Sequence, residues 1–194
     1  MPKKAEQNHL QDFLTELLNS LQIDAEVASP FQESNFFDYA SELLSDAGIY
    51  DNIEQNDFRD INRGMKIDGF NWNPLERTLS GIIVNFSGES SLGSISKSDI
   101  EKLGRKTAKF ISNIQNESFK DSLAATSKGR ELIESMSIYL EEVNKYRVII
   151  LTDLVMSNRV KLKKLKIADI NGKEAFFEIW DLDRIHTLAT AGSE

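Results

Sequence analysis

The chain has 194 residues, of which 40% are hydrophobic and 28% charged, as expected for a globular domain with a real core. It has no cysteine, which excludes disulfides and a thiolate zinc site and suits a reducing cytoplasm. The sequence contains no apolar run of about 20 residues, so no signal peptide or membrane span is expected. A net charge of −8 argues against tight non-specific nucleic-acid binding by the chain as a whole, but leaves room for a local basic groove.

Helical patterns dominate the first 50 residues. Apolar residues recur at helical spacing over residues 9–22, and a connector follows up to Pro30. Ser34 is a candidate N-cap for a second helix, which Gly48 ends. We expect residues 1–30 to form a helical preface and residues 31–194 to form one α/β domain. The polar stretch 51–64 is expected to be a loop or a short irregular helix.

A hairpin is the next expected element. The run from Lys66 to Trp72 and the apolar strand 79–86 flank a turn that contains Pro74. A loop rich in Gly and Ser then leads to a capping box that begins at Ser98 and starts a helix. A further helical stretch spans about residues 127–144.

The last third of the chain returns to strands. Residues 147–153 form a continuous β-branched run, which predicts a central strand buried on both faces. The basic, alternating run 160–170, the turn Asn171-Gly172 and the strand 175–180 predict a hairpin, and a short helix covers 182–188. Together these elements predict an α/β fold with a mixed sheet flanked by helices.

Asp68 is the leading candidate for chemistry. An acidic residue early in such a hairpin is where many metal-dependent nucleases hold their first metal ligand, and Mg²⁺ prefers oxygen ligands. Period-two pairing places Asp68 opposite Ile83 or Val84, give or take two residues, so the facing strand offers no further carboxylate. The alternative is an aspartate that accepts hydrogen bonds from the backbone beside a glycine.

Other residues are candidates to complete such a site. Glu42, on the second helix, could supply a further catalytic or metal-binding carboxylate together with Asp68, the favoured alternative being a solvated helix face. Glu33 and Asp46 lie on or beside the same helix. One basic residue of the helix after the hairpin could replace the strand lysine that a nuclease uses, the alternative being a solvent-facing stripe. These residues are Lys102, Arg105, Lys106 and Lys109.

The densest basic patch lies near the C-terminal hairpin. Its cations alternate with apolar residues, so several can share one face and contact phosphates. Charges on an edge strand also protect a sheet from pairing with another chain, and both interpretations stay open. The residues are Arg159, Lys161, Lys163, Lys164 and Lys166.

Several segments together resemble the N-terminal region of the abortive-infection phage-resistance (AIPR) proteins. They are the hairpin from Gly64 to Gly88, the capped helix start 98–103, the strand 148–153 and the ending 178–185. The resemblance spans roughly residues 30–190. It implies a bacterial phage-defence protein whose larger C-terminal region lies outside this chain, and a restriction-endonuclease-like PD-(D/E)xK core. On that pattern Asp68 matches the first acidic position, whereas residues 82–86 contain no (D/E)xK tripeptide.

Three functional hypotheses follow. The first is a nuclease-like domain with a degenerate metal site and a nucleic-acid-contact or assembly role. The second is an active Mg²⁺-dependent nuclease with relocated ligands. The third is a dimerisation domain without nucleic-acid binding. The expected partners are nucleic acid, the C-terminal region of the same protein and a second copy of the chain.

Overall fold

The computed structural model describes residues 2–21, 30–162, 165 and 169–191. In these residues no helix is long and apolar enough to cross a membrane. The helices are α1 (Pro2–Leu21), α2 (Pro30–Asp46), α3 (Lys97–Ser112), α4 (Glu117–Asp121), α5 (Lys128–Ser137) and α6 (Leu182–Ala191). The strands are β1 (Glu54–Asp60), β2 (Met65–Asn73), β3 (Thr78–Asn85), β4 (Ser94–Ile95), β5 (Lys145–Thr152), β6 (Val155–Met156) and β7 (Ala175–Trp180).

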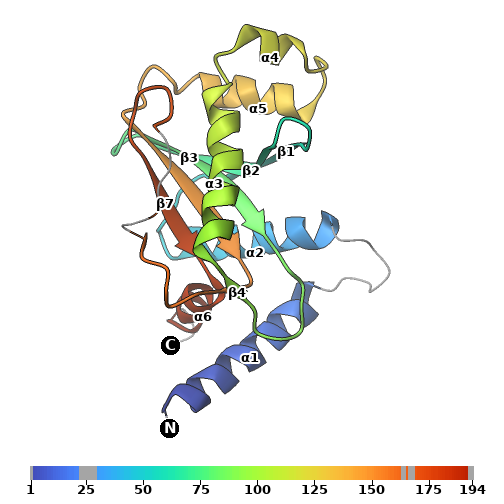
Figure 1. Cartoon of the computed structure of the whole chain (residues 1–194), viewed down its shortest axis with the longest axis vertical. Helices are drawn as coiled ribbons and strands as arrows, with labels where there is room; N and C mark the ends of the chain where they lie inside the picture. The colour runs from blue at the N-terminus through green and yellow to red at the C-terminus, as the bar shows by residue number, and fades with distance from the viewer. Residues whose placement is uncertain (1, 22–29, 163–164, 166–168, 192–194) are drawn as a thin grey trace.

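The main sheet is mixed and has the strand order β1-β2-β3-β5-β7. The first three strands pair antiparallel, whereas β3, β5 and β7 run parallel to one another. Helix α3 crosses one face of the sheet, and α1, α2 and α6 pack together on the other (Figure 1). The predicted α/β fold with a mixed sheet flanked by helices is therefore confirmed.

Strand β5 is the centre of the hydrophobic core. Ile149 and Leu151 pack in the cluster under α1, α2 and α6, while Val148 and Ile150 pack on the side of α3. All four side chains are buried, as predicted for a central strand covered on both faces. Because neither face of this strand meets water, its apolar residues need not alternate with polar ones, which explains the continuous apolar run.

Helix α2 starts earlier than its sequence predicted. Pro30 is its first described residue, and a proline suits the first turn because that turn needs no N–H donor. Ser34 lies inside the helix and accepts a hydrogen bond of 3.0 Å from Gln55 Nε2, so its predicted role as N-cap is wrong. The predicted end is confirmed: Gly48 has φ 66°, and the Gly48 and Ile49 N–H groups donate to Ser45 and Leu44, as in a Schellman motif.

The cap of α3 is displaced from its predicted position. Ser96 is the N-cap, and its hydroxyl accepts from Asp99 N–H while the Asp99 carboxylate accepts from Ser96 N–H. The capping box predicted from Ser98 is thus two residues too late. The helical stretch predicted over about 127–144 begins near its predicted start, with Ser127 as the N-cap of α5, but the helix ends at Ser137 and the chain continues as turns.

The stretch 51–64 contains a strand, so its prediction as a loop or irregular helix is wrong. Strand β1 pairs with β2 along the edge of the sheet, and its residues alternate between exposed and half-buried. Phe58 is its main apolar contact, packing against Phe110 on α3. A polar edge strand with one aromatic anchor lacks the hydrophobic pattern by which strands are recognised in a sequence.

The C-terminal hairpin was predicted partly correctly. The turn is confirmed, since Asn171 and Gly172 have φ of 51° and 74° and Ile170 and Lys173 exchange hydrogen bonds of 3.0 Å. The described residues of 160–170 form no strand beyond the single bridge at Ile170, so the predicted first strand is wrong there. Strand β7 instead pairs parallel with β5, from Tyr146↔Ala175 to Leu151↔Trp180, so it joins the buried centre of the sheet rather than the preceding segment.

Candidate functional site

The candidate site lies where the β2–β3 ladder ends. Backbone pairing runs from Asn73↔Thr78 to Gly69↔Ile82, and the β1–β2 register shifts at the same level. Beyond this point side chains meet the backbone of Val84: Asp68 Oδ2 accepts from Val84 N at 2.7 Å, and Lys66 Nζ donates to Val84 O at 2.8 Å. The predicted placement of Asp68 opposite Ile83 or Val84 is confirmed.

Lys66 is the centre of this site. Its ammonium lies 2.8 Å from the Val84 carbonyl oxygen, 3.2 Å from Glu33 Oε2 and 3.4 Å from Asp68 Oδ2. We call these three oxygens the oxygen cage. They come from three different elements, namely β3, α2 and β2. The lysine side chain is only 8% exposed, so its charge is stabilised by these neighbours rather than by water.

Burial raises the pKa of Asp68 from 3.8 to about 6, although Lys66 and the Val84 amide act in the opposite direction. Because the folded state then binds this proton more tightly than the unfolded state, protonation of Asp68 adds a pH-dependent contribution to stability that is fully present below pH 3.8. That contribution is lost as the pH rises through about 6. We predict a ¹³C carboxyl titration of Asp68 with a midpoint near pH 6, and a midpoint near 4 would contradict it.

The helical carboxylate at this site is Glu33 rather than Glu42. The two residues are separated by nine positions, which turns them roughly 180° apart around α2. Glu33 contacts Lys66 and also accepts from Arg59 Nη2 at 2.9 Å, whereas Glu42 is exposed and forms no hydrogen bond with Asp68 within the described chain. The structure therefore does not bring the two predicted catalytic residues together, and their catalytic role stays a prediction.

Sequence reasoning also missed Lys66. The available signal was a pair of charged residues, Lys66 and Asp68, at alternate positions of a strand whose other residues carry no charge. Two such residues point to the same side of a regular strand, so they are expected to meet.

A pocket of about 310 Å³ opens beside the oxygen cage. Arg59, Lys66 and Lys106 bring three cations to its wall, and Glu33 and Asp60 bring two carboxylates. Both carboxylates already form ion pairs with basic side chains, at 2.9 to 3.2 Å. Among the described residues of this wall, Lys106 is the cation that forms no ion pair.

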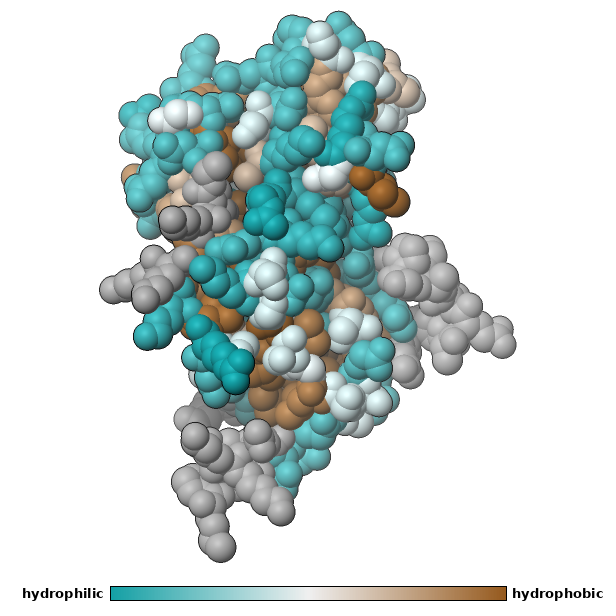
Figure 2. Space-filling view, in the orientation of Figure 1, coloured by the Kyte–Doolittle hydropathy of each residue, from teal (hydrophilic) through white to brown (hydrophobic). Residues whose placement is uncertain are grey.

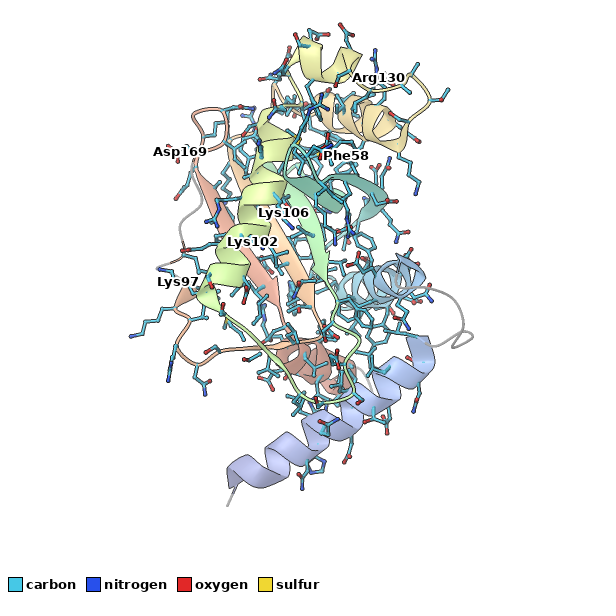
Figure 3. The ribbon with its side chains drawn as sticks, turned by 45° about the vertical axis from the view of Figure 1, so that its right-hand side comes forward. Phe58, Lys97, Lys102, Lys106, Arg130 and Asp169 are labelled. Atoms are coloured by element: carbon cyan, nitrogen blue, oxygen red, sulfur yellow. The ribbon has the colours of Figure 1, made fainter. Side chains whose placement is uncertain are left out.

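Lys106 belongs to a basic stripe on α3, formed by Lys102, Arg105, Lys106 and Lys109. Burial and the neighbouring Lys102, Lys66 and Arg59 lower the pKa of Lys106, as expected where cations are crowded. No member of the stripe forms a salt bridge within the described chain. Figure 3 shows Lys97, Lys102 and Lys106 in a row along α3, and Figure 2 shows hydrophilic residues over the central part of this face. The solvent-facing alternative fits Lys102, Arg105 and Lys109, whereas Lys106 is half-buried at the pocket.

The basic patch predicted near the C-terminal hairpin is only partly described. Arg159 and Lys161 are exposed and follow the short strand β6. Lys163, Lys164 and Lys166 lie outside the described residues. Nucleic-acid binding by this patch stays a prediction.

The arrangement of these side chains does not fit Mg²⁺. A divalent ion between Asp68 and Glu33 would have to displace the Lys66 ammonium, which already contacts both carboxylates. Residues 2–21, 30–162, 165 and 169–191 contain no group of three or more His, Asp or Glu that could hold a metal ion. With the lysine in place, Asp68 and Glu33 serve as partners of an ammonium rather than as ligands of a metal.

These features define a class: an α/β domain with a mixed sheet and a buried lysine–carboxylate site at the end of a hairpin. The model of the abortive infection phage resistance protein N-terminal domain matches residues 36–187. The chain belongs to this family, as its resemblance implied. No curated protein and no solved structure matches the chain significantly.

Proposed function

We propose that this domain is a nucleic-acid-contact module of a phage-resistance protein, built on a restriction-endonuclease-like frame whose metal site is degenerate. The family match supports the role in phage resistance. The antiparallel hairpin beside parallel strands, with Asp68 where the ladder ends, is compatible with the frame that the family resemblance implies. Lys66 between the two carboxylates supports the loss of a metal site.

The basic stripe on α3 is the observation that carries the proposal. The chain is acidic overall, so cations without acidic partners on one helix face stand out against a net charge of −8. Lys102, Lys106 and Lys109 are spaced at i, i+4 and i+7, so they lie in a row on one side of the helix. A row of cations can contact successive phosphates of a nucleic-acid backbone. Arg59, which is exposed, lies on the wall of the pocket that Lys106 also lines.

The test is salt-dependent binding of fluorescently labelled single-stranded DNA, duplex DNA and RNA, followed by anisotropy. We expect the double variant Lys102→Glu/Lys106→Glu to weaken binding of the preferred substrate by about tenfold or more at low salt. The slope of log affinity against log salt should decrease in magnitude by about 1 to 2. Both effects follow from the loss of phosphate contacts.

A matched control compares the single variants Lys102→Glu and Lys120→Glu, because Lys120 lies on α4, does not line the pocket and, like Lys102, forms no ion pair among the described residues. These two variants have the same net charge, so a general charge effect would weaken binding by both equally. Equal losses would overturn the assignment to α3. Salt-independent dimerisation without nucleic-acid binding would favour a dimerisation domain instead. Mg²⁺-dependent cleavage that Asp68→Ala abolishes would favour the active nuclease.

A further inference from the structure

We infer that the Lys66 ammonium serves as a permanent, covalently tethered cation in the oxygen cage, and that it takes the position a dissociable divalent ion would need. This inference goes beyond nucleic-acid contact, because it concerns the cation requirement of the site and does not depend on what the α3 stripe binds.

The geometry matches the ammonium to its surroundings. A lysine ammonium has three N–H groups and no acceptor, and the oxygen cage supplies three oxygens. Two of them belong to carboxylates, Glu33 and Asp68, and the third is the carbonyl oxygen of Val84. Two anionic oxygens and a carbonyl from three separate elements are also the donor types that bind hard divalent cations.

The ammonium is held in place from both faces of the sheet. The carbonyl of Lys66 accepts a hydrogen bond of 3.0 Å from Thr107 Oγ1 on α3, which fixes the lysine backbone. Its side chain ends at Glu33 on α2, which Arg59 also contacts at 2.9 Å. Thr107 is fully buried, so the bond that anchors this strand is shielded from water.

A divalent ion could enter only if the ammonium left. The displaced lysine would have to find new hydrogen bonds or stay buried without partners, which is costly. The wild-type domain should therefore ignore divalent ions at this position.

The first experiment uses the wild-type chain and Mn²⁺, with no nucleic acid present. We expect the amide signal of Val84 in a ¹H–¹⁵N spectrum to show no more paramagnetic broadening than the average buried amide of the same sheet. Selective broadening of Val84 by micromolar Mn²⁺, abolished by Asp68→Asn, would overturn the inference, because the ion would then occupy the oxygen cage beside or instead of the lysine.

The second experiment removes the tethered cation. Lys66→Ala leaves the oxygens without an ammonium, and we expect Mn²⁺ to raise its midpoint of thermal unfolding and to bind at least about tenfold more tightly than it binds the wild type. Lys66→Met, which fills the same space with an uncharged chain, should gain no such response. Mn²⁺ binding by Lys66→Ala no tighter than by the wild type would show that these oxygens are not a cation site. If Lys66→Ala does not fold, the Mn²⁺ titration of the wild-type chain still tests whether a divalent ion enters the oxygen cage.

The nucleic-acid-contact role and the tethered-cation inference fail separately, whereas Mn²⁺ in the oxygen cage would also overturn the degenerate metal site of the proposed function. Metal titrations without nucleic acid report on the oxygen cage alone, and charge reversal on α3 leaves Glu33, Lys66 and Asp68 unchanged. Both proposals are supported if Lys102→Glu/Lys106→Glu weakens nucleic-acid binding and the oxygen cage of the wild-type chain binds no Mn²⁺.

Discussion

Replacing Asp68 by alanine is expected to reduce the free energy of unfolding by about 3 kcal/mol at pH 7 to 8. The substitution leaves the Val84 N–H, which donates to Asp68 Oδ2 at 2.7 Å, without its acceptor in a buried position. It also removes one of the two carboxylates that balance the buried charge of Lys66. Urea-induced unfolding, followed by circular dichroism, measures the difference as a shift in midpoint.

Asp68→Asn is the matched control for this experiment. Asparagine has nearly the same shape and keeps an oxygen for the Val84 amide, but it lacks the charge that faces Lys66. We expect it to retain about half of the stability lost in Asp68→Ala. A loss below about 1 kcal/mol for Asp68→Ala would contradict the structural role, since a buried donor would then have gone unpaired at little cost. Abolished Mg²⁺-dependent cleavage at unchanged stability would instead assign Asp68 to catalysis.

The sequence predicted best the elements that local chemistry determines. The run 147–153 predicted a strand covered on both faces, because its central apolar residues do not alternate with polar ones. Asn171 and Gly172 tolerate the positive φ that the tight turn requires. The placement of Asp68 beside Val84 followed from the position of the turn and the period of two.

Elements whose partners lie far away in the sequence were harder to predict. Strand β1 gains its pairing from β2 and its main anchor from Phe58 on Phe110, and neither contact is visible in a polar run. The choice between Glu33 and Glu42 depended on which side of α2 lies beside the hairpin. Helix periodicity identifies the apolar face of a helix, but it does not say which polar residue at the border of that face meets a particular strand. Strand β7 could pair with the preceding segment or with β5, and only the available buried edge decided.

The oxygen cage connects these observations to function. A facing strand of Ile83, Val84 and Asn85 cannot supply the carboxylate and lysine of a nuclease tripeptide. The structure shows that a lysine is present nevertheless, on β2 rather than β3, and that it lies between the carboxylates instead of beside them. Two carboxylates and a lysine are thus close together, and the lysine occupies the space between the carboxylates, which is why we propose a binding role in preference to cleavage.

Gly69→Ala is expected to destabilise the domain by about 2 to 3 kcal/mol, because this position has no room for a methyl group. A Cβ on Gly69 would lie 2.5 Å from the Glu54 carbonyl oxygen of β1 and 2.5 Å from the Phe37 ring of α2. Phe37 is 2% exposed within the core, and a strand carbonyl cannot move without breaking the β1–β2 ladder. Thermal or urea-induced unfolding measures the loss.

Gly93→Ala provides the control, because its added Cβ would meet only the end of the Leu154 side chain, at 2.6 Å, and a leucine can change rotamer. We expect a loss of less than about 1 kcal/mol there. Gly69→Ala should also disturb the oxygen cage, because moving β1 away from β2 shifts the strand that carries Lys66 and Asp68. The Val84 amide signal should therefore shift in Gly69→Ala and stay in place in Gly93→Ala. An unshifted Val84 amide together with wild-type stability would mean that Gly69 does not set the packing of β1 and α2 around the oxygen cage.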